Sequence, residues 1–214
     1  MNVQASEIVA TITVGNETHT HFAEKICTLI EESAKVRGTG IAKRNPEYIR
    51  KKLATGHAVI CIIENEVAGF CYVETWSHGR YVSNSGLIVS PDFRNLGLAR
   101  NIKRAAFDLA RNLYPEARVF GITTSGPVMK INTELGYAPV PFNELTQDED
   151  FWKGCSGCSN YAILESKERK MCLCTGMLAM SKKEEEMKKR LKEEADKQKF
   201  SLGAGEFRVV KYSF

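Results

Sequence analysis

A basic turn that contains a glycine lies between an apolar run and an amphipathic segment, and such a turn could bind an anion. The apolar run is Leu87, Ile88 and Val89, and residues 90–92 end it. The turn and the helix start after it comprise Arg94, Asn95, Leu96, Gly97, Leu98, Ala99 and Arg100. Backbone N–H groups at a helix start lack partners and carry the positive end of the helix dipole. The stretch therefore predicts a site for an anion such as a pyrophosphate, with Lys103 beside it.

Four cysteines in two tight pairs could bind a metal ion. The pairs are Cys155-x-x-Cys158 and Cys172-x-Cys174. Structural zinc is held tetrahedrally by four such ligands, so the pairs predict a zinc site. The alternative is that the four are small buried residues near a substrate pocket. The other three cysteines fall in helix or strand patterns, and we expect them in the core: Cys27, Cys61 and Cys71.

Composition limits the class of protein. A chain of 214 residues with 43% hydrophobic residues suits one domain with an appendage. Its apolar runs are too short to cross a bilayer, and the N-terminus has no signal-peptide pattern, so we expect a cytoplasmic protein without a membrane partner. The net charge of +4 fits an anionic ligand but is too small to indicate nucleic-acid binding. Neither a P-loop nor a Rossmann fingerprint is present, because the turn has a single glycine and no Gly-Lys-Ser/Thr.

The elements that must position these residues follow from hydrophobic periodicity. Strands are expected at residues 8–14, 57–63, 67–76, 81–89, 117–124 and 137–142. Helices are expected from residue 18 or 20 to 37, and at 46–55, 98–113 and 128–135. This order predicts an α/β fold, in which a mixed sheet has helices on both faces.

The chain changes character at Ser181. Glutamates and basic residues follow at i, i+4 spacing, as in Glu184–Lys188, which predicts a solvated helix. We therefore expect a domain in residues 1–180 and a charged helix and tail in residues 181–214. A thin apolar seam on this helix indicates a contact between copies, as in a homodimer.

The turn and the element order together carry a resemblance. Residues 94–99 read R-x-x-G-x-A after a V-x-P strand end, which resembles the acyl-CoA loop of the GNAT (GCN5-related) N-acyltransferase superfamily. The resemblance implies acetyl-CoA, or another acyl-CoA such as succinyl-CoA, as co-substrate. It also implies that two strands splay apart around the pantetheine arm, with Leu87, Ile88 and Val89 along the thioester. The residues implied on the opposite wall and the following helix are Thr123, Thr124 and Asn132.

A narrower resemblance is to the GNAT domain of N-acetylglutamate synthases. Three pieces carry it: residues 40–48, 119–124 and 135–140. It implies glutamate or a related amino acid as acceptor, in amino-acid biosynthesis. Carboxylates of such an acceptor would pair with Lys43 and Arg44, or with Arg169; plain surface charge is the alternative. The amino-acid-kinase domain of many such synthases is absent from this sequence.

The implied reaction needs a deprotonated amine, a stabilised oxyanion and a protonated leaving thiol. Glu74 is the candidate base, with a solvated strand carboxylate as the alternative. Tyr137 is the candidate acid, with core packing as the alternative. Two other functions remain open: acetylation of a protein lysine or N-terminus, and acyl-CoA binding without turnover as a regulatory module.

Overall fold

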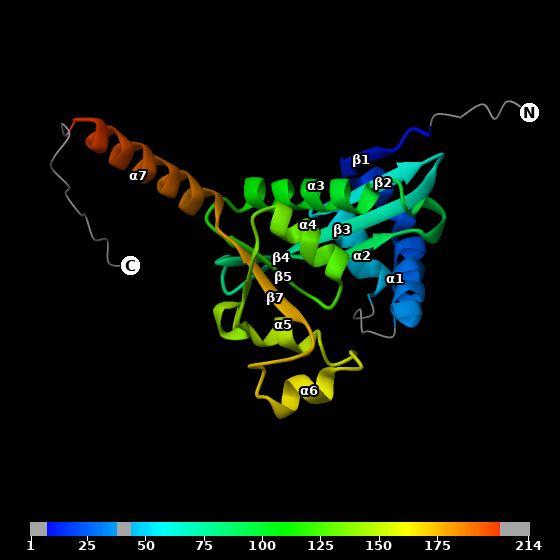
Figure 1. Cartoon of the computed structure of the whole chain (residues 1–214). Helices are drawn as coiled ribbons and strands as arrows, with labels where there is room; N and C mark the ends of the chain where they lie inside the picture. Colours follow the sequence, from blue (N-terminus) through cyan, green and yellow to red (C-terminus); the bar gives the residue numbers. More distant parts are fainter. Residues whose placement is uncertain (1–7, 38–43, 202–214) are drawn as a thin grey trace, which may run out of the picture.

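The computed structural model describes residues 8–37 and 44–201, which form a seven-stranded mixed sheet with helices on both faces (Figure 1). The strands run in the order β1-β2-β3-β4-β5-β7-β6, and β4–β5 is the one parallel pair among these described strands. The strands are β1 (Thr11–Val14), β2 (Ala58–Ile63), β3 (Glu66–Trp76), β4 (Tyr81–Val89), β5 (Arg118–Thr123), β6 (Ala138–Val140) and β7 (Thr175–Ala179). The α/β fold class predicted from the sequence is confirmed.

The helices cover both faces of this sheet. They are α1 (Ala23–Arg37), α2 (Pro46–Ala54), α3 (Leu98–Leu113), α4 (Gly126–Glu134), α5 (Glu149–Lys153), α6 (Tyr161–Ser166) and α7 (Lys182–Ser201). Side chains of α1 and α2 pack with β2, β3 and β4 in one core cluster. The apolar stripe of α3 packs on the opposite face, where Ile102 and Ala106 are fully buried. Two faces that each bury an apolar helix stripe account for the α/β layering.

The parallel strands β4 and β5 separate along their length. They pair from Tyr81–Arg118 to Ser83–Phe120, and no further pairing links them, although β4 runs on to Val89. The separated strands leave unpaired backbone and a gap in the middle of the sheet. The splayed pair implied by the sequence resemblance is therefore present.

A bulge in β4 lies beside this gap. Its pairing with β3 shifts between Phe70–Ile88 and Tyr72–Ser85. Gly86 sits in the bulge with φ +66°, and a Cβ there would lie 2.8 Å from Cε1 of Tyr72. Glycine is required at this position because both the backbone angle and the close ring exclude a side chain.

The sequence prediction missed the region between β6 and α7. Helices α5 and α6 are only five and six residues long, and β7 inserts between β5 and β6. Short helices lack a full hydrophobic repeat, and β7 reads Thr-Gly-Met-Leu-Ala without a β-branched run. The first strand is also shorter than predicted, since β1 begins at Thr11.

Helix α7 projects from the body of the molecule, and its first turn is anchored (Figure 1). Glu184 bonds to Arg118, with the closest N–O distance 2.6 Å, and Glu185 and Lys183 pair with Arg111 and Glu116. The described helices include none that is both long and apolar enough to cross a membrane. The division into residues 1–180 and 181–214 stays a prediction.

Candidate functional site

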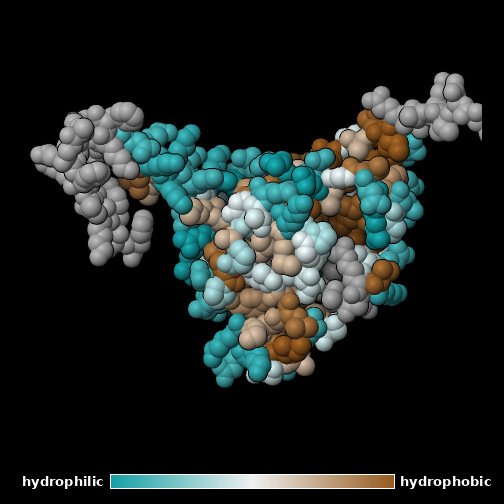
Figure 2. Space-filling view, viewed as in Figure 1, coloured by the Kyte–Doolittle hydropathy of each residue, from teal (hydrophilic) through white to brown (hydrophobic). Residues whose placement is uncertain are grey.

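A cavity of about 560 Å³ occupies the gap between β4 and β5. One wall includes Leu87 and the bulge of β4, and the other includes Thr123, Thr124 and Ser125 after β5. Figure 2 shows the face viewed in Figure 1, where a pale patch of intermediate hydropathy has hydrophilic surface around it and hydrophobic surface below it. The cavity therefore lies where the predicted pantetheine arm would enter.

The three residues predicted along the thioester direct their side chains to different places, while the backbone contact implied for them stays a prediction. Leu87 lines the cavity, but Ile88 is 2% exposed and packs in the core cluster with α1 and α2. Val89 packs toward α3 on the other face of the sheet. Alternate strand side chains point to opposite faces, so three consecutive residues cannot all face one ligand.

The predicted anion-binding turn has an open helix start. Gly97 is the N-cap of α3 with φ +72°, and no side chain caps the first N–H groups. Asn95 also has a positive φ, and Leu96 is 47% exposed. Donors left uncapped at a helix N-terminus suit an anion. Arg94 ends the 3-10 turn before Gly97, and Leu98 and Ala99 lie in the first turn of α3. The guanidinium of Arg100 forms an ion pair with Glu134 at 3.2 Å.

Lys103 does not lie beside the anion site as predicted. It is 2% exposed and lines the cavity, with its Nζ 5.5 Å from the centre of the Tyr137 ring. Burial lowers the pKa of the Lys103 ammonium. Position six of α3 faces the sheet, and helical periodicity alone could have placed this lysine inward.

Asn132 on α4 presents an unpartnered acceptor to the cavity. Its side chain is 1% exposed, and its Nδ2 donates to the Met177 sulfur at 3.4 Å. Its Oδ1 is buried and has no hydrogen-bond partner among the residues that the structure describes. A buried acceptor without a donor is costly unless a ligand supplies one. The geometry suits the N–H of an amide-containing ligand.

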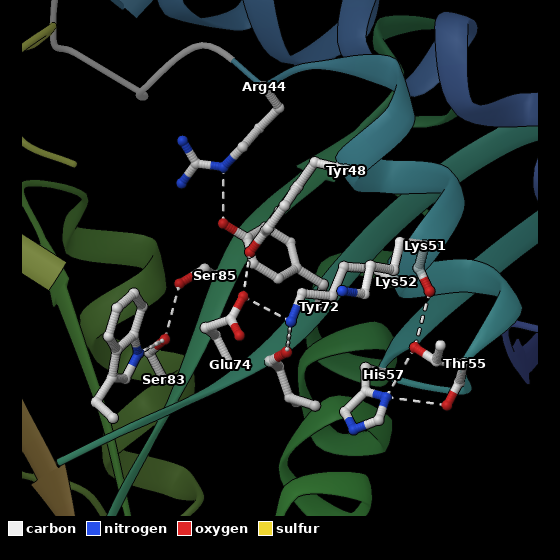
Figure 3. Close-up of polar contacts among 12 residues, drawn as sticks. Arg44, Tyr48, Lys51, Lys52, Thr55, His57, Tyr72, Glu74, Ser83 and Ser85 are labelled. Atoms are coloured by element: carbon white, nitrogen blue, oxygen red, sulfur yellow. Dashed lines mark hydrogen bonds and ion pairs between the residues drawn. The ribbon is translucent and has the colours of Figure 1, made fainter. Parts of the chain in front are cut away.

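A polar network forms the other end of the cavity (Figure 3). Asn45 caps α2 by accepting the N–H of Glu47 at 2.8 Å, and this fixes Tyr48 one turn into the helix. Arg44 Nε donates to the Tyr72 hydroxyl at 2.7 Å, and Arg44, Tyr48 and Tyr72 all line the cavity.

Glu74 stands behind this network and is not among the residues that line the cavity. It accepts the hydroxyl hydrogen of Tyr48 and pairs with Lys52, whose Nζ lies 2.5 Å from its Oε2 (Figure 3). Burial, the neighbouring Tyr72 and the bond to Glu74 raise the pKa of Tyr48, which keeps it protonated. Sequence reasoning missed Tyr48, Tyr72 and Lys52, although Tyr48 and Lys52 share one face of a helix at i, i+4 spacing.

Tyr137 lies in the core rather than at the cavity. It is 2% exposed, and its hydroxyl donates to Asn84 Oδ1 at 2.6 Å. Asn84 Nδ2 in turn donates to the carbonyl of Ala106 at 3.2 Å. The hydroxyl proton is thus committed to a buried network, which supports core packing over the acid role.

The two further residues expected to bind the acceptor have different outcomes. Lys43 lies outside the described residues. Arg169 follows α6 and pairs with Glu149 at 2.6 Å, with its side chain 42% exposed and outside the cavity lining. Arg169 is therefore corrected to a surface ion pair, and Arg44 remains the arginine at the cavity.

All four paired cysteines surround a second, smaller cavity of about 20 Å³. Burial, followed by repulsion from the neighbouring thiols, raises the pKa of Cys155 to about 11 and that of Cys174 to about 12. In the described part of the chain, no group of three acidic, histidine or cysteine side chains stands ready to hold a metal ion. Cys27, Cys61 and Cys71 are buried in the core, as predicted.

Comparison with known proteins identifies the family. Residues 23–125 match the Acetyltransferase (GNAT) family. No curated protein matches the chain.

Several solved structures share the fold. One is N-acetylglutamate synthase from Neisseria gonorrhoeae complexed with coenzyme A and N-acetyl-glutamate, at 18% identity and a TM-score of 0.58. The match covers 83% of this chain but 36% of that one, so this chain spans about a third of its length. Rv2747 from Mycobacterium tuberculosis, in complex with CoA and NLQ, matches at 15% identity and a TM-score of 0.57, covering 79% and 98% of the two chains. Salmonella typhimurium yncA with acetyl-CoA matches at 14% and 0.54, covering 82% and 94%.

The sequence match spans the elements from α1 through β5 that build the splayed strands and the α3 loop. The solved structures above share the overall fold of the chain. Residues 23–125 thus form a GNAT acetyltransferase domain, and the chain has the GNAT fold.

Proposed function

We propose that this enzyme transfers an acetyl group from acetyl-CoA to the amine of a small amino acid, glutamate being the leading candidate. The observation that carries the proposal is the position of Arg44 at one end of the cavity between β4 and β5. A guanidinium there can bind a carboxylate of the acceptor. The low-identity likeness to structures with bound N-acetyl-glutamate or CoA is in keeping with this choice.

The donor would lie along the splayed strands. Its pyrophosphate would accept hydrogen bonds from the uncapped N–H groups at Gly97 and in the first turn of α3. Its pantetheine arm would run between Leu87 and Thr123, where an amide N–H could satisfy Asn132 Oδ1. The thioester would then face the end of the cavity that holds Tyr48.

The chemistry assigned to this end is proton removal from the acceptor ammonium and attack of the amine on the thioester carbon. Tyr48 donates its own hydroxyl hydrogen to Glu74, so its oxygen lone pairs are available to the amine N–H. The amine proton would pass to Tyr48 as the Tyr48 proton moves to Glu74. In this scheme Tyr48 is catalytic and Glu74 receives the proton behind it. The carbon–sulfur bond would then break, and the second proton lost by the attacking nitrogen would pass to the departing sulfur, so that CoA leaves as a thiol.

A small acceptor is favoured over a protein because the cavity has a second wall. Residues of the α5–α6 segment line it, including Phe151, Cys155 and Asn160. In the proposed arrangement, this wall would hinder a polypeptide from reaching the thioester. Neither protein acetylation nor acyl-CoA binding without turnover requires an acceptor pocket that is closed by this wall.

The test is release of CoA thiol from acetyl-CoA with candidate amines in parallel. We expect turnover with glutamate or a close relative such as glutamine or aspartate, and none with lysine-containing peptides. Succinyl-CoA in a second series decides the donor. The proposal would be refuted if only peptides were acetylated, or if none of the amines tested gave turnover.

Three wider predictions accompany this function. We propose a role in amino-acid biosynthesis, a cytoplasmic location, and a homodimer through the charged helix α7. Exposed Met187 supports a contact on α7. Sedimentation equilibrium of the full chain tests the dimer directly.

A further inference from the structure

The four paired cysteines come from the two ends of one excursion of the chain. Cys155 and Cys158 lie in the turn after α5, and Cys172 and Cys174 lie immediately before β7. About a dozen residues, including α6, separate the pairs. The two cysteine pairs, which are separated in the sequence, therefore lie side by side in the fold.

All four cysteines line the cavity of about 20 Å³. A volume of this size holds about one water-sized sphere. The other lining residues are mainly apolar or aromatic, among them Ile122, Phe142 and Leu164, and none is acidic or histidine. The potential metal ligands that surround this cavity are therefore the four thiols.

The backbone of Asn160 links the two pairs. Its N–H donates to the Cys158 sulfur at 3.4 Å, and its carbonyl oxygen accepts the thiol of Cys172 at 3.8 Å. A backbone N–H aimed at a sulfur stabilises negative charge on it, and such hydrogen bonds accompany thiolate ligands in metal sites. The carbonyl bond to Cys172 would be given up when that thiol loses its proton.

The excursion packs on the domain through one small core cluster, to which it contributes Trp152 and Leu164. Within residues 149–174, all of which the structure describes, Trp152 and Leu164 are the buried residues. Its helices are shorter than two turns each. Small segments with so little core commonly depend on a disulfide or a structural metal.

We propose that Cys155, Cys158, Cys172 and Cys174 together bind one structural zinc ion. Tetrahedral zinc takes four thiolates at about 2.3 Å. Binding releases the four thiol protons and draws the sulfurs inward from the spacing seen here, at which the described residues form no ready metal group. Three of the cysteines, Cys155, Cys158 and Cys174, also line the larger cavity, so the ion would fix one wall of the acetyl-transfer site.

The experiment measures metal content rather than activity, so its outcome is independent of the proposed acceptor. The full-length protein is purified under reducing conditions without chelator, and zinc is quantified by mass spectrometry. We expect about one zinc per chain. Replacement by cobalt(II) should give the sulfur-to-cobalt charge-transfer bands of a tetrahedral thiolate site. Cys155→Ser and Cys174→Ser should each lose most of the metal.

Cys27→Ala is the matched control, because Cys27 is a buried cysteine of α1 that lines neither cavity, and it should keep a full complement of zinc. Wild-type protein that takes up neither zinc nor cobalt would overturn the proposal. So would alkylation and mass analysis that find the pairs joined as disulfides, or zinc that persists in both serine variants.

Discussion

Arg44 on the segment before α2 donates its Nε–H to the hydroxyl of Tyr72 on β3 at 2.7 Å, and the same guanidinium carbon lies 5.6 Å from the centre of the Tyr72 ring. The tyrosine holds the arginine at the end of the cavity between the splayed strands. This relationship joins a loop whose sequence indicated only positive charge to the strand that carries Glu74. It is the basis for the first prediction.

Arg44→Ala should raise the KM for the amino-acid acceptor while leaving the KM for acetyl-CoA close to wild type. Hydrogen bonds to a charged group contribute about 1.5–3 kcal/mol, which corresponds to roughly 10–150-fold in KM. Steady-state kinetics with each substrate varied in turn measures the split. Arg50→Ala is the control, since Arg50 pairs with Glu24 and Glu47 and is not a cavity residue. An unchanged acceptor KM in Arg44→Ala would show that the acceptor carboxylate binds elsewhere.

Gly97→Glu should weaken CoA binding. The new carboxylate would stand at the helix start where the pyrophosphate is proposed to bind, and Coulomb repulsion at about 4 Å predicts a loss of affinity of about tenfold or more. Gly79→Glu is a matched control, because Gly79 also has a positive φ and open space around it but lies in the β3–β4 turn. Isothermal titration with CoA should show loss in Gly97→Glu alone, and equal losses would count against the loop assignment.

Tyr48→Phe and Glu74→Gln should both lower kcat by about 100-fold or more, because proton transfer by a positioned side chain contributes about 10²–10⁴-fold. Acetyl-CoA binding should be unaffected. Tyr114→Phe removes a hydroxyl of the same kind, which lies 2.8 Å from His57 Nε2 and outside the cavity, and should keep the wild-type kcat. A wild-type rate in Tyr48→Phe would exclude the proposed path of the proton.

Tyr137→Phe distinguishes the acid role from core packing. We expect kcat within a few-fold of wild type, because the hydroxyl serves Asn84 and does not face the cavity. Leaving Asn84 Oδ1 without its donor should lower the free energy of unfolding by about 1–3 kcal/mol. Urea denaturation and steady-state kinetics on the same preparation test both parts. A large fall in kcat with unchanged stability would restore the acid role.

Lys103→Met should stabilise the protein at neutral pH by about 1–3 kcal/mol, because it removes a buried lysine to which the described part of the chain offers no ion pair. Burial lowers the folded-state pKa of Lys103, so between that value and the unfolded value of about 10.4 the unfolded chain binds the extra proton. The free energy of unfolding of wild type therefore rises with pH over this window.

The stability advantage of Lys103→Met should accordingly be largest at neutral pH and shrink as the pH approaches the upper end of the window. Urea unfolding of both proteins at a series of pH values measures the difference, in which titrations common to both cancel. An advantage that grows with pH would contradict a buried, protonated Lys103. Activity should fall in the variant, since Lys103 lines the cavity.

The sequence by itself determined the fold class and the position of the uncapped turn before α3, for which donor binding is proposed. Local signals decide both. They are the apolar strand before Ser90, the single glycine Gly97 in the turn, and the apolar residues of α3, which recur at helical spacing. The family resemblance rested on this stretch together with the order of the strands and helices around it.

Tertiary structure alone decided which side chains meet. Tyr48, Tyr72 and Glu74 converge because α2 packs over β3. Arg169, which was predicted to bind the acceptor, instead forms an ion pair with Glu149. The sequence showed the charges and thiols but not their neighbours, since a side chain's partner depends on the packing of elements far apart in the chain, and the short helices α5 and α6 carry too few residues to reveal a face.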